Sequence, residues 1–182
     1  MDLPLTYTMS CHLATQTLWT LLLAACLSSQ TFVVSATGSG DYRDIQSAVT
    51  AVPSGSTLLV RPGTYGGFSI QSKSLYVCGD RGGVTVGGGQ FAAPVQVGPT
   101  AAQHRVVLRG MTFEAPFFAV SPMLVIDSAA GAVCCDQLVV AGIKISASNN
   151  VHLRTTTSRP STNVVGGYPG LALENSNAEV SA

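Results

Sequence analysis

Short aliphatic runs, separated by Gly, Pro, Ser, Asn or Asp, make up most of the chain after residue 30. Each run is rich in Val, Leu or Ile and only a few residues long, which is typical of β-strands. The predicted strands lie at 31–36, 57–61, 68–71, 75–78, 84–86, 95–97, 105–108, 124–126, 132–135, 138–140, 143–145, 151–154 and 171–173. No Asn-Gly or Asp-Gly pair joins them, so the sequence does not favour a hairpin-built meander or sandwich.

One stretch has helical rather than strand spacing. Aliphatic residues recur with a period near 3.6 between positions 45 and 52. Asp44 can cap the start of this helix, and Pro53 and Gly55 end it. A helix of two turns can cover the edge of a sheet but cannot form a layer of its own.

Internal repetition indicates how the strands are arranged. Segments 126–133, 145–151 and 173–180 each place an aliphatic residue before a small polar turn, with Val six or seven positions later. Irregular intervals between regular units are typical of a solenoid, in which insertions leave from the turns. The alignment stacks Ile126, Ile145 and Leu173 in one inward row. It also places the asparagines of 149–150 and 175–177 at corners, where they could tolerate left-handed backbone.

The stretch from Gly38 to Tyr65 carries a family resemblance. It contains Gly-Ser-Gly-Asp-Tyr, then Ile-Gln-Ser-Ala-Val, then a strand that ends in Pro-Gly-Thr-Tyr. This order resembles the opening of right-handed parallel β-helix proteins of the pectin lyase-like superfamily, which includes pectinesterases. The likeness is specific over 31–65 and looser up to Val86, and from Val106 onward it rests on the repeat alone.

The resemblance implies an all-β fold, a right-handed parallel β-helix over residues 30–182 with a short N-terminal capping helix. A first rung exposes an unpaired strand edge, and an amphipathic helix laid across it blocks edge pairing. Ile45, Val49 and Val52 are expected to plug this end. We therefore interpret the motif as a cap that carries no chemistry.

The N-terminal segment predicts export. An uncharged apolar run at 18–27 matches the core of a signal peptide, predicted here as 1–29, and is too short to span a bilayer. The protein is thus expected to be secreted, without a membrane span. Because residues 1–42 contain no Lys or Arg, a buried apolar helix stays an alternative. Residues 23–26 also resemble a lipobox, so lipid anchoring at the cell envelope through Cys26 is a further alternative.

Charge and cysteine content exclude several partners. Only 10% of the residues are charged, nine basic and nine acidic, and no Lys or Arg run exists, so nucleic acid is not expected as a partner. Removal of the leader leaves Cys78, Cys134 and Cys135, an odd number that we interpret as small apolar fillers. On a strand, Cys134 and Cys135 would face opposite sides. No cofactor or metal is expected, and His104 and His152 are predicted to be surface or turn residues.

No local motif of the family's enzymes can be matched residue by residue. Candidate catalytic residues come from the repeat alignment, which puts Asp127, Ser146 and Glu174 in one outward row. Two strand spacings separate the carboxylates by about 9 to 10 Å, near the upper limit for inverting glycosidases. We favour an ordinary solvated pair because Ser146 lies between them. The alignment also places Asp136 beside Arg154, as expected for a surface ion pair.

The sequence therefore predicts a secreted β-helix domain that acts as a structural or carbohydrate-binding surface, with polysaccharide as a possible partner. The alternative is a pectinesterase-like or polysaccharide lyase-like enzyme whose degenerate or truncated site uses Asp127, Asp136, Arg154 or Glu174. No second cap is visible near residue 182. We therefore expect either a truncated product or another chain that covers the open C-terminal end.

Overall fold

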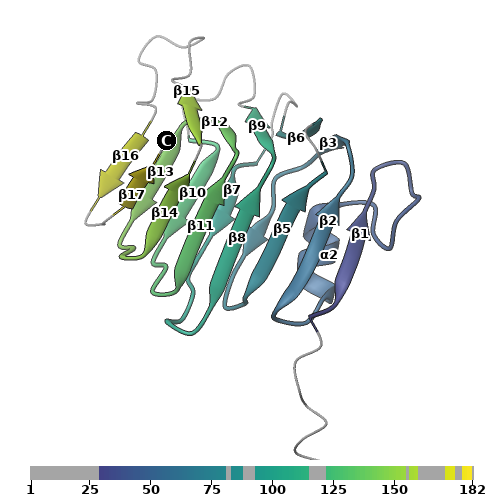
Figure 1. Ribbon diagram of the computed structural model, residues 1–182, viewed down its shortest axis with the longest axis horizontal. Helices are drawn as coiled ribbons and strands as arrows, with labels where there is room; N and C mark the ends of the chain where they lie inside the picture. Colours follow the sequence, from purple (N-terminus) through teal and green to yellow (C-terminus); the bar gives the residue numbers. More distant parts are fainter. Residues whose placement is uncertain are drawn as a thin grey trace, which may run out of the picture.

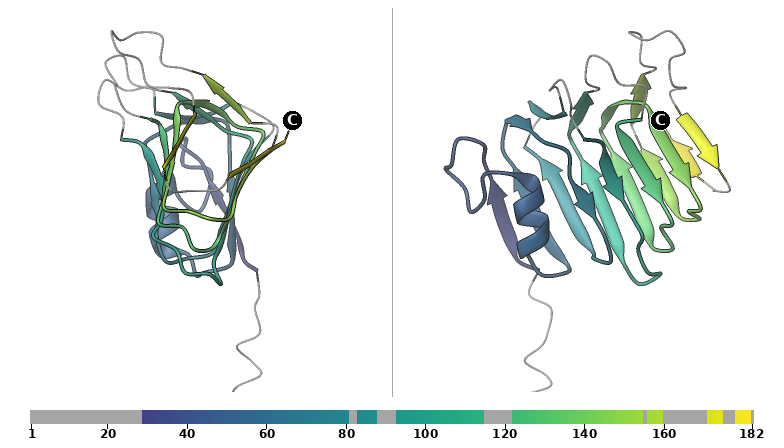
Figure 2. Two further views of the ribbon diagram at one scale, coloured as in Figure 1. Left: turned by 90° about the vertical axis from the view of Figure 1, so that its left-hand side faces the viewer. Right: turned by 180° about the vertical axis from the view of Figure 1, so that it is seen from behind.

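Parallel strands form three sheets around one interior (Figures 1 and 2). The computed structural model describes residues 29–80, 83–87, 93–114, 122–154, 156–159, 171–174 and 178–181. The chain visits the three sheets in turn and then returns to the first, so that successive coils stack along one axis. This is the arrangement of a parallel β solenoid. The predicted leader at 1–29, including Cys26, lies outside the described residues apart from Ser29.

The strands are as follows. Sheet A contains β1 (Thr31–Val34), β2 (Ser56–Val60), β5 (Leu75–Gly79), β8 (Arg105–Arg109), β11 (Ala132–Asp136), β14 (Val151–Arg154) and β17 (Ala178–Ser181). Sheet B contains β3 (Gly63–Tyr65), β6 (Val84–Gly87), β9 (Thr112–Glu114), β12 (Val139–Ala141) and β15 (Thr157–Arg159). Sheet C contains β4 (Ser69–Ile70), β7 (Val95–Val97), β10 (Leu124–Asp127), β13 (Ile143–Ser146) and β16 (Leu171–Glu174).

Ile126 and Ile145 form an inward row, and the backbone register continues to Leu173. Ile126 is in register with Ile145, and Ile145 with Leu173. Ile126 and Ile145 are fully buried. Burying one such side chain stabilises the fold by about 1.5 to 3 kcal/mol, and each row repeats this gain along the stack.

The predicted register of the third repeat is wrong by two residues at the end of the segment. The alignment predicts that Val180 is equivalent to Val133 and Val151. In the structure Val151 is in register with Ala178, whereas Val180 is in register with Leu153. The turn from sheet C to sheet A shortens by one residue from one coil to the next, and matching valines alone could not reveal this.

Residues other than asparagine hold the left-handed corners after β10 and β13. Ser128 (φ 53°) and Ala147 (φ 48°) hold this conformation directly after β10 and β13. Asn149 and Asn150 do not; they lie later in their turn. The chain has to change direction as soon as the strand ends. The first residue after the strand therefore adopts left-handed backbone whether or not it is Asn. Asn175 and Asn177 lie outside the described residues.

Helix α2 (Ile45–Ala51) lies at the N-terminal end of the stack, where it packs against β1 and β4. Asp44 caps it as predicted: its Oδ1 accepts from the Ser47 backbone at 2.8 Å and its Oδ2 from the Ser47 hydroxyl at 2.7 Å. These hydrogen bonds lower the pKa of the Asp44 carboxyl. Ile45, Val49 and Val52 are buried, as expected of the residues that close the end.

The edge of the first strand is covered. Val33 of β1 donates its N–H to Asp41 Oδ2 at 2.7 Å and accepts from the Asp41 backbone at 2.8 Å. The neighbouring Ser35 N–H donates to the Tyr42 carbonyl at 2.8 Å. The loop before α2 therefore occupies hydrogen-bonding groups that would otherwise be open to another chain.

Four strands were not predicted: β3, β9, β15 and β17. Three of them belong to sheet B, have three residues each and contain few large aliphatic side chains, so they lack the alternation that identifies a strand. No helix in the described ranges is long and apolar enough to cross a membrane.

Candidate functional site

The outer face of sheet A carries several reactive and charged side chains. Strand register aligns these side chains in two adjacent rows. Both rows cross β5, β8, β11 and β14, and one of them continues onto β17. One row consists of Tyr76, Val107, Cys134, His152 and Glu179. The other row consists of Cys78, Arg109, Asp136 and Arg154. Neighbouring positions in a row are one strand spacing apart, about 4.8 Å.

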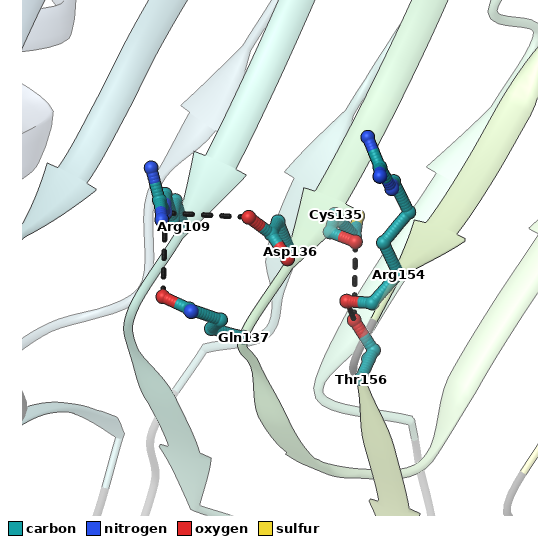
Figure 3. A network of polar contacts seen from close by, with 6 residues as sticks. All are labelled: Arg109, Cys135, Asp136, Gln137, Arg154 and Thr156. Carbon is teal, nitrogen blue, oxygen red and sulfur yellow. Dashed lines mark hydrogen bonds and ion pairs between the residues drawn. The ribbon is translucent and has the colours of Figure 1, made fainter. Parts of the chain in front are cut away.

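Two neighbouring side chains hold the Arg109 guanidinium through its Nε atom (Figure 3). Its Nε lies 3.2 Å from Asp136 Oδ2 and 3.3 Å from Gln137 Oε1. The described contacts of this guanidinium all use Nε, so Nη1 and Nη2 are left for a ligand. Because the side chain of Arg109 is 53% exposed, the ion pair contributes only about 0 to 1 kcal/mol to stability. Its main effect is to fix the direction of the guanidinium.

The predicted Asp136–Arg154 ion pair is wrong. The two residues are in register on adjacent strands, as the alignment expects. However, the Asp136 carboxylate pairs with Arg109 on the other neighbouring strand, and the Arg154 guanidinium lies apart from it (Figure 3). A carboxylate between two arginines can face either one, and the Gln137 amide orients Arg109 toward it.

A groove of about 510 Å³ runs beside Arg109, at the corner between sheets A and B. It crosses three successive coils and is lined by Cys78, Gly79, Arg109, Gly110, Met111, Thr112, Gln137 and Val139. Its floor exists because two glycines meet there: a Cβ on Gly79 would lie 2.2 Å from the Gly110 carbonyl oxygen. Gly110 and Gln137 both have left-handed backbone at the corner (φ 69° and 52°), which turns the chain immediately after β8 and β11.

Cys134, His152 and Glu179 form a second cluster, which the sequence analysis missed. His152 Nδ1 lies 2.9 Å from Glu179 Oε2, and Nε2 lies 2.9 Å from Asn150 Oδ1. The Cys134 side chain is half-buried on the strand beside His152. Residue spacing alone could not find this cluster, because it depends on the length of each turn.

The cysteines face as predicted but are not equivalent. Cys135 is fully buried, whereas Cys134 faces outward. Burial raises the pKa of the Cys135 thiol to about 12, and the neighbouring Cys134 adds to this rise. Burial also raises the pKa of Cys78, and Arg109 opposes the rise in part. All three thiols are free.

The four catalytic candidates do not converge. Asp136 and Arg154 lie on sheet A, whereas Asp127 and Glu174 lie on sheet C. The predicted outward row of Asp127, Ser146 and Glu174 has the expected register. The Ser146 hydroxyl donates to Asp127 Oδ1 at 2.7 Å, and the Lys144 ammonium pairs with Glu174 Oε2 at 2.9 Å. Each carboxylate thus has its own partner.

The remaining sequence candidates have structural roles. His104 sits in the turn before β8, where its Nδ1 accepts from the Ala101 backbone at 3.3 Å. Gly38 turns the chain with φ 84°, and a Cβ on Gly40 would lie 2.6 Å from the Val33 carbonyl oxygen. Among the described side chains, no group of three or more His, Cys, Asp or Glu could hold a metal ion.

Comparison with known proteins found no relative. The chain matches no protein-family model, and neither a curated protein nor a solved structure matches it.

Proposed function

We propose that this protein is a non-catalytic, secreted β-helix domain that binds an acidic polysaccharide along the groove at the corner of sheets A and B. The observation that carries the proposal is Arg109, whose Nε is fixed by Asp136 and Gln137 while neither Nη group contacts a described residue, so both are left for a ligand. The edge of a guanidinium matches the two oxygens of a uronate carboxylate.

The shape of the groove supports a linear ligand. Its lining residues come from three consecutive coils, so a chain-like molecule lying there would run along the axis of the stack. Thr112 and Gln137 supply hydroxyl and amide groups, and Met111 and Val139 supply apolar surface. Such a mixture suits sugar rings, which have polar edges and apolar faces. Arg154 adds positive charge to the same side of sheet A.

We infer that the coils are right-handed and that the fold is of the pectin lyase-like type. Parallel strands of one sheet joined by a crossover are right-handed in about 98% of cases. Every return from one strand of sheet A to the next in this stack is such a crossover. The motif from Gly38 to Tyr65 and the cap formed by α2 support the same inference. The apolar segment at 18–27 supports secretion, and anchoring through Cys26 is the alternative.

Titration with polysaccharides tests binding. We expect polygalacturonate to bind more tightly than fully methyl-esterified pectin, because only the free carboxylate can pair with Arg109. An Arg109→Gln variant should bind about 10- to 150-fold more weakly, the equivalent of one charged hydrogen bond of about 1.5 to 3 kcal/mol. Arg105→Gln is the matched control, since Arg105 lies on the same strand outside the groove lining. Equal affinity of wild type and Arg109→Gln would contradict the proposal.

An enzyme is the second candidate, and the adjacent carboxylate and guanidinium of Asp136 and Arg109 favour it. Incubation with pectin and with polygalacturonate, with and without Ca²⁺, separates the two functions. Methanol release or unsaturated products that disappear in Asp136→Asn would show catalysis. Binding without either product would support the surface role.

A further inference from the structure

The turn between β4 and β5 holds the C-terminal end of α2. Lys73, in this turn, donates from Nζ to the backbone carbonyls of Val49 at 2.6 Å and Val52 at 2.7 Å. The carbonyl of Thr50 lies 3.5 Å from the same nitrogen. The last carbonyls of a helix have no partner within the helix, and a cation there interacts favourably with the helix dipole. Lys73 therefore satisfies carbonyls that α2 cannot satisfy by itself.

The first turn of α2 covers the edge of sheet C. Gln46 Oε1 accepts a hydrogen bond from the Ser69 backbone N–H at 2.7 Å. Ser69 begins β4, which is the edge strand of sheet C at the N-terminal end of the stack. Gln46 Nε2 donates to Thr50 Oγ1 at 3.2 Å, which fixes the amide on the helix. The Gln46 side chain thus occupies a backbone group that an added strand would otherwise use.

The same turn also holds the loop that follows α2. The Ser74 N–H donates to Ser54 Oγ at 3.0 Å, and the Gly55 N–H donates to the Ser74 carbonyl at 2.8 Å. Lys73 and Ser74 therefore fasten the helix end and the following loop to the second coil. The position of α2 depends on polar contacts as well as on its buried face.

The two lysines of the chain differ in their surroundings. Lys73 is half-buried, and among the described residues no carboxylate pairs with it, so its charge acts on the helix end. Lys144 lies on the outer face of sheet C and pairs with Glu174 at 2.9 Å. Lys144 therefore serves as an internal control for Lys73. Lys73 does not line the corner groove, so its role is independent of polysaccharide binding.

We propose that Lys73 is a latch that holds α2 over the edge of sheet C, and that α2 opens as one unit when this latch is removed. In the open form the Ser69 N–H and the buried face of α2 are exposed, and the edge of β4 is able to accept an added strand. The later coils stay folded, because β5, β8 and β11 remain paired with one another. Such local opening occurs without global unfolding in many proteins.

Hydrogen exchange of the full chain, followed by nuclear magnetic resonance, tests the latch. Lys73→Met keeps the aliphatic stem and removes the ammonium. We expect the amides of Ser69 and Val52 to exchange about tenfold or more faster in this variant, the equivalent of one charged hydrogen bond. Lys73 contacts neither N–H group, since Ser69 donates to Gln46 and Val52 donates within the helix. Acceleration of both amides therefore reports opening of the whole unit.

Three controls separate latch opening from other effects. Lys144→Met should leave the exchange rates of Ser69 and Val52 unchanged. The Leu108 amide, in β8, should keep its wild-type rate in Lys73→Met, because opening leaves the later coils intact. In the wild-type protein, acetic anhydride should modify Lys73 more slowly than Lys144, and urea should remove this difference.

Any one of three results would overturn the proposal. The first is that Ser69 and Val52 keep their wild-type exchange rates in Lys73→Met. The second is that the Leu108 amide accelerates as much as they do, which would indicate global unfolding. The third is equal acetylation of Lys73 and Lys144 in the native protein. This last measurement uses the wild type, so it decides the question even if Lys73→Met does not fold.

Discussion

Replacing Ile145 by Ala should be one of the most damaging single changes in the stack. Ile145 is fully buried and lies in register between Ile126 and Leu173. Truncation removes three carbon atoms, worth about 2.4 kcal/mol at 0.8 kcal/mol each, before any cost of the cavity. With the cavity included, we expect a loss of about 3 to 4 kcal/mol, within the usual range for Ile to Ala.

Urea unfolding followed by circular dichroism measures this loss. Lys144→Ala is the matched control, because Lys144 is the preceding residue on β13 and points outward to Glu174. Its exposed ion pair contributes at most about 1 kcal/mol. The register would be refuted if Ile145→Ala cost less than the control, since a slip of one residue exchanges the two faces of a strand.

Three further outcomes are expected. Asp44→Ala should lower the free energy of unfolding by about 1 kcal/mol at neutral pH. The Ser47 hydrogen bonds lower the Asp44 pKa below 3.8. The stabilisation by the Asp44 cap is therefore fully present above pH 3.8 and is lost as the pH falls through the lowered pKa. The unfolding curves of the variant and the wild type should accordingly converge in acid. Gly110→Ala should lower the free energy of unfolding in urea by about 1 to 2 kcal/mol, because the φ of Gly110 is 69°. The added methyl group should also narrow the groove and weaken polysaccharide binding. Unchanged affinity for polysaccharide would argue against the groove as the binding site. Cys135, with a pKa of about 12, should resist iodoacetamide at pH 8 until urea unfolds the protein, and labelling in the native state would contradict its burial.

Local sequence patterns predict the parts of the fold that depend on neighbouring residues. The α2 helix follows from Asp44 and the spacing of Ile45 and Val49, and the structure confirms it. The inward row of Ile126 and Ile145 follows from aliphatic residues before similar turns, and it is confirmed too. Sheet B was mostly missed because strands such as β3 have three residues and no alternation.

The candidate site could not be predicted because it depends on register between distant segments. Gly79 and Gly110 meet at one corner although 30 intervening positions separate them. Cys134 and His152 become neighbours only once the turn between β11 and β14 is known. For the same reason, the alignment of the internal repeats placed Asp136 beside Arg154 but could not show that the Asp136 carboxylate pairs with Arg109.

Interstrand nuclear Overhauser contacts test the parallel stack most directly. Backbone protons of Ile126 should contact those of the residues at and next to Ile145, and Ile145 should contact the Leu173 region in the same way. Contacts that follow this parallel order would support the stack and the surfaces built on it. An antiparallel order, or no contact between these segments, would contradict the register on which the groove and the Cys134 cluster both depend.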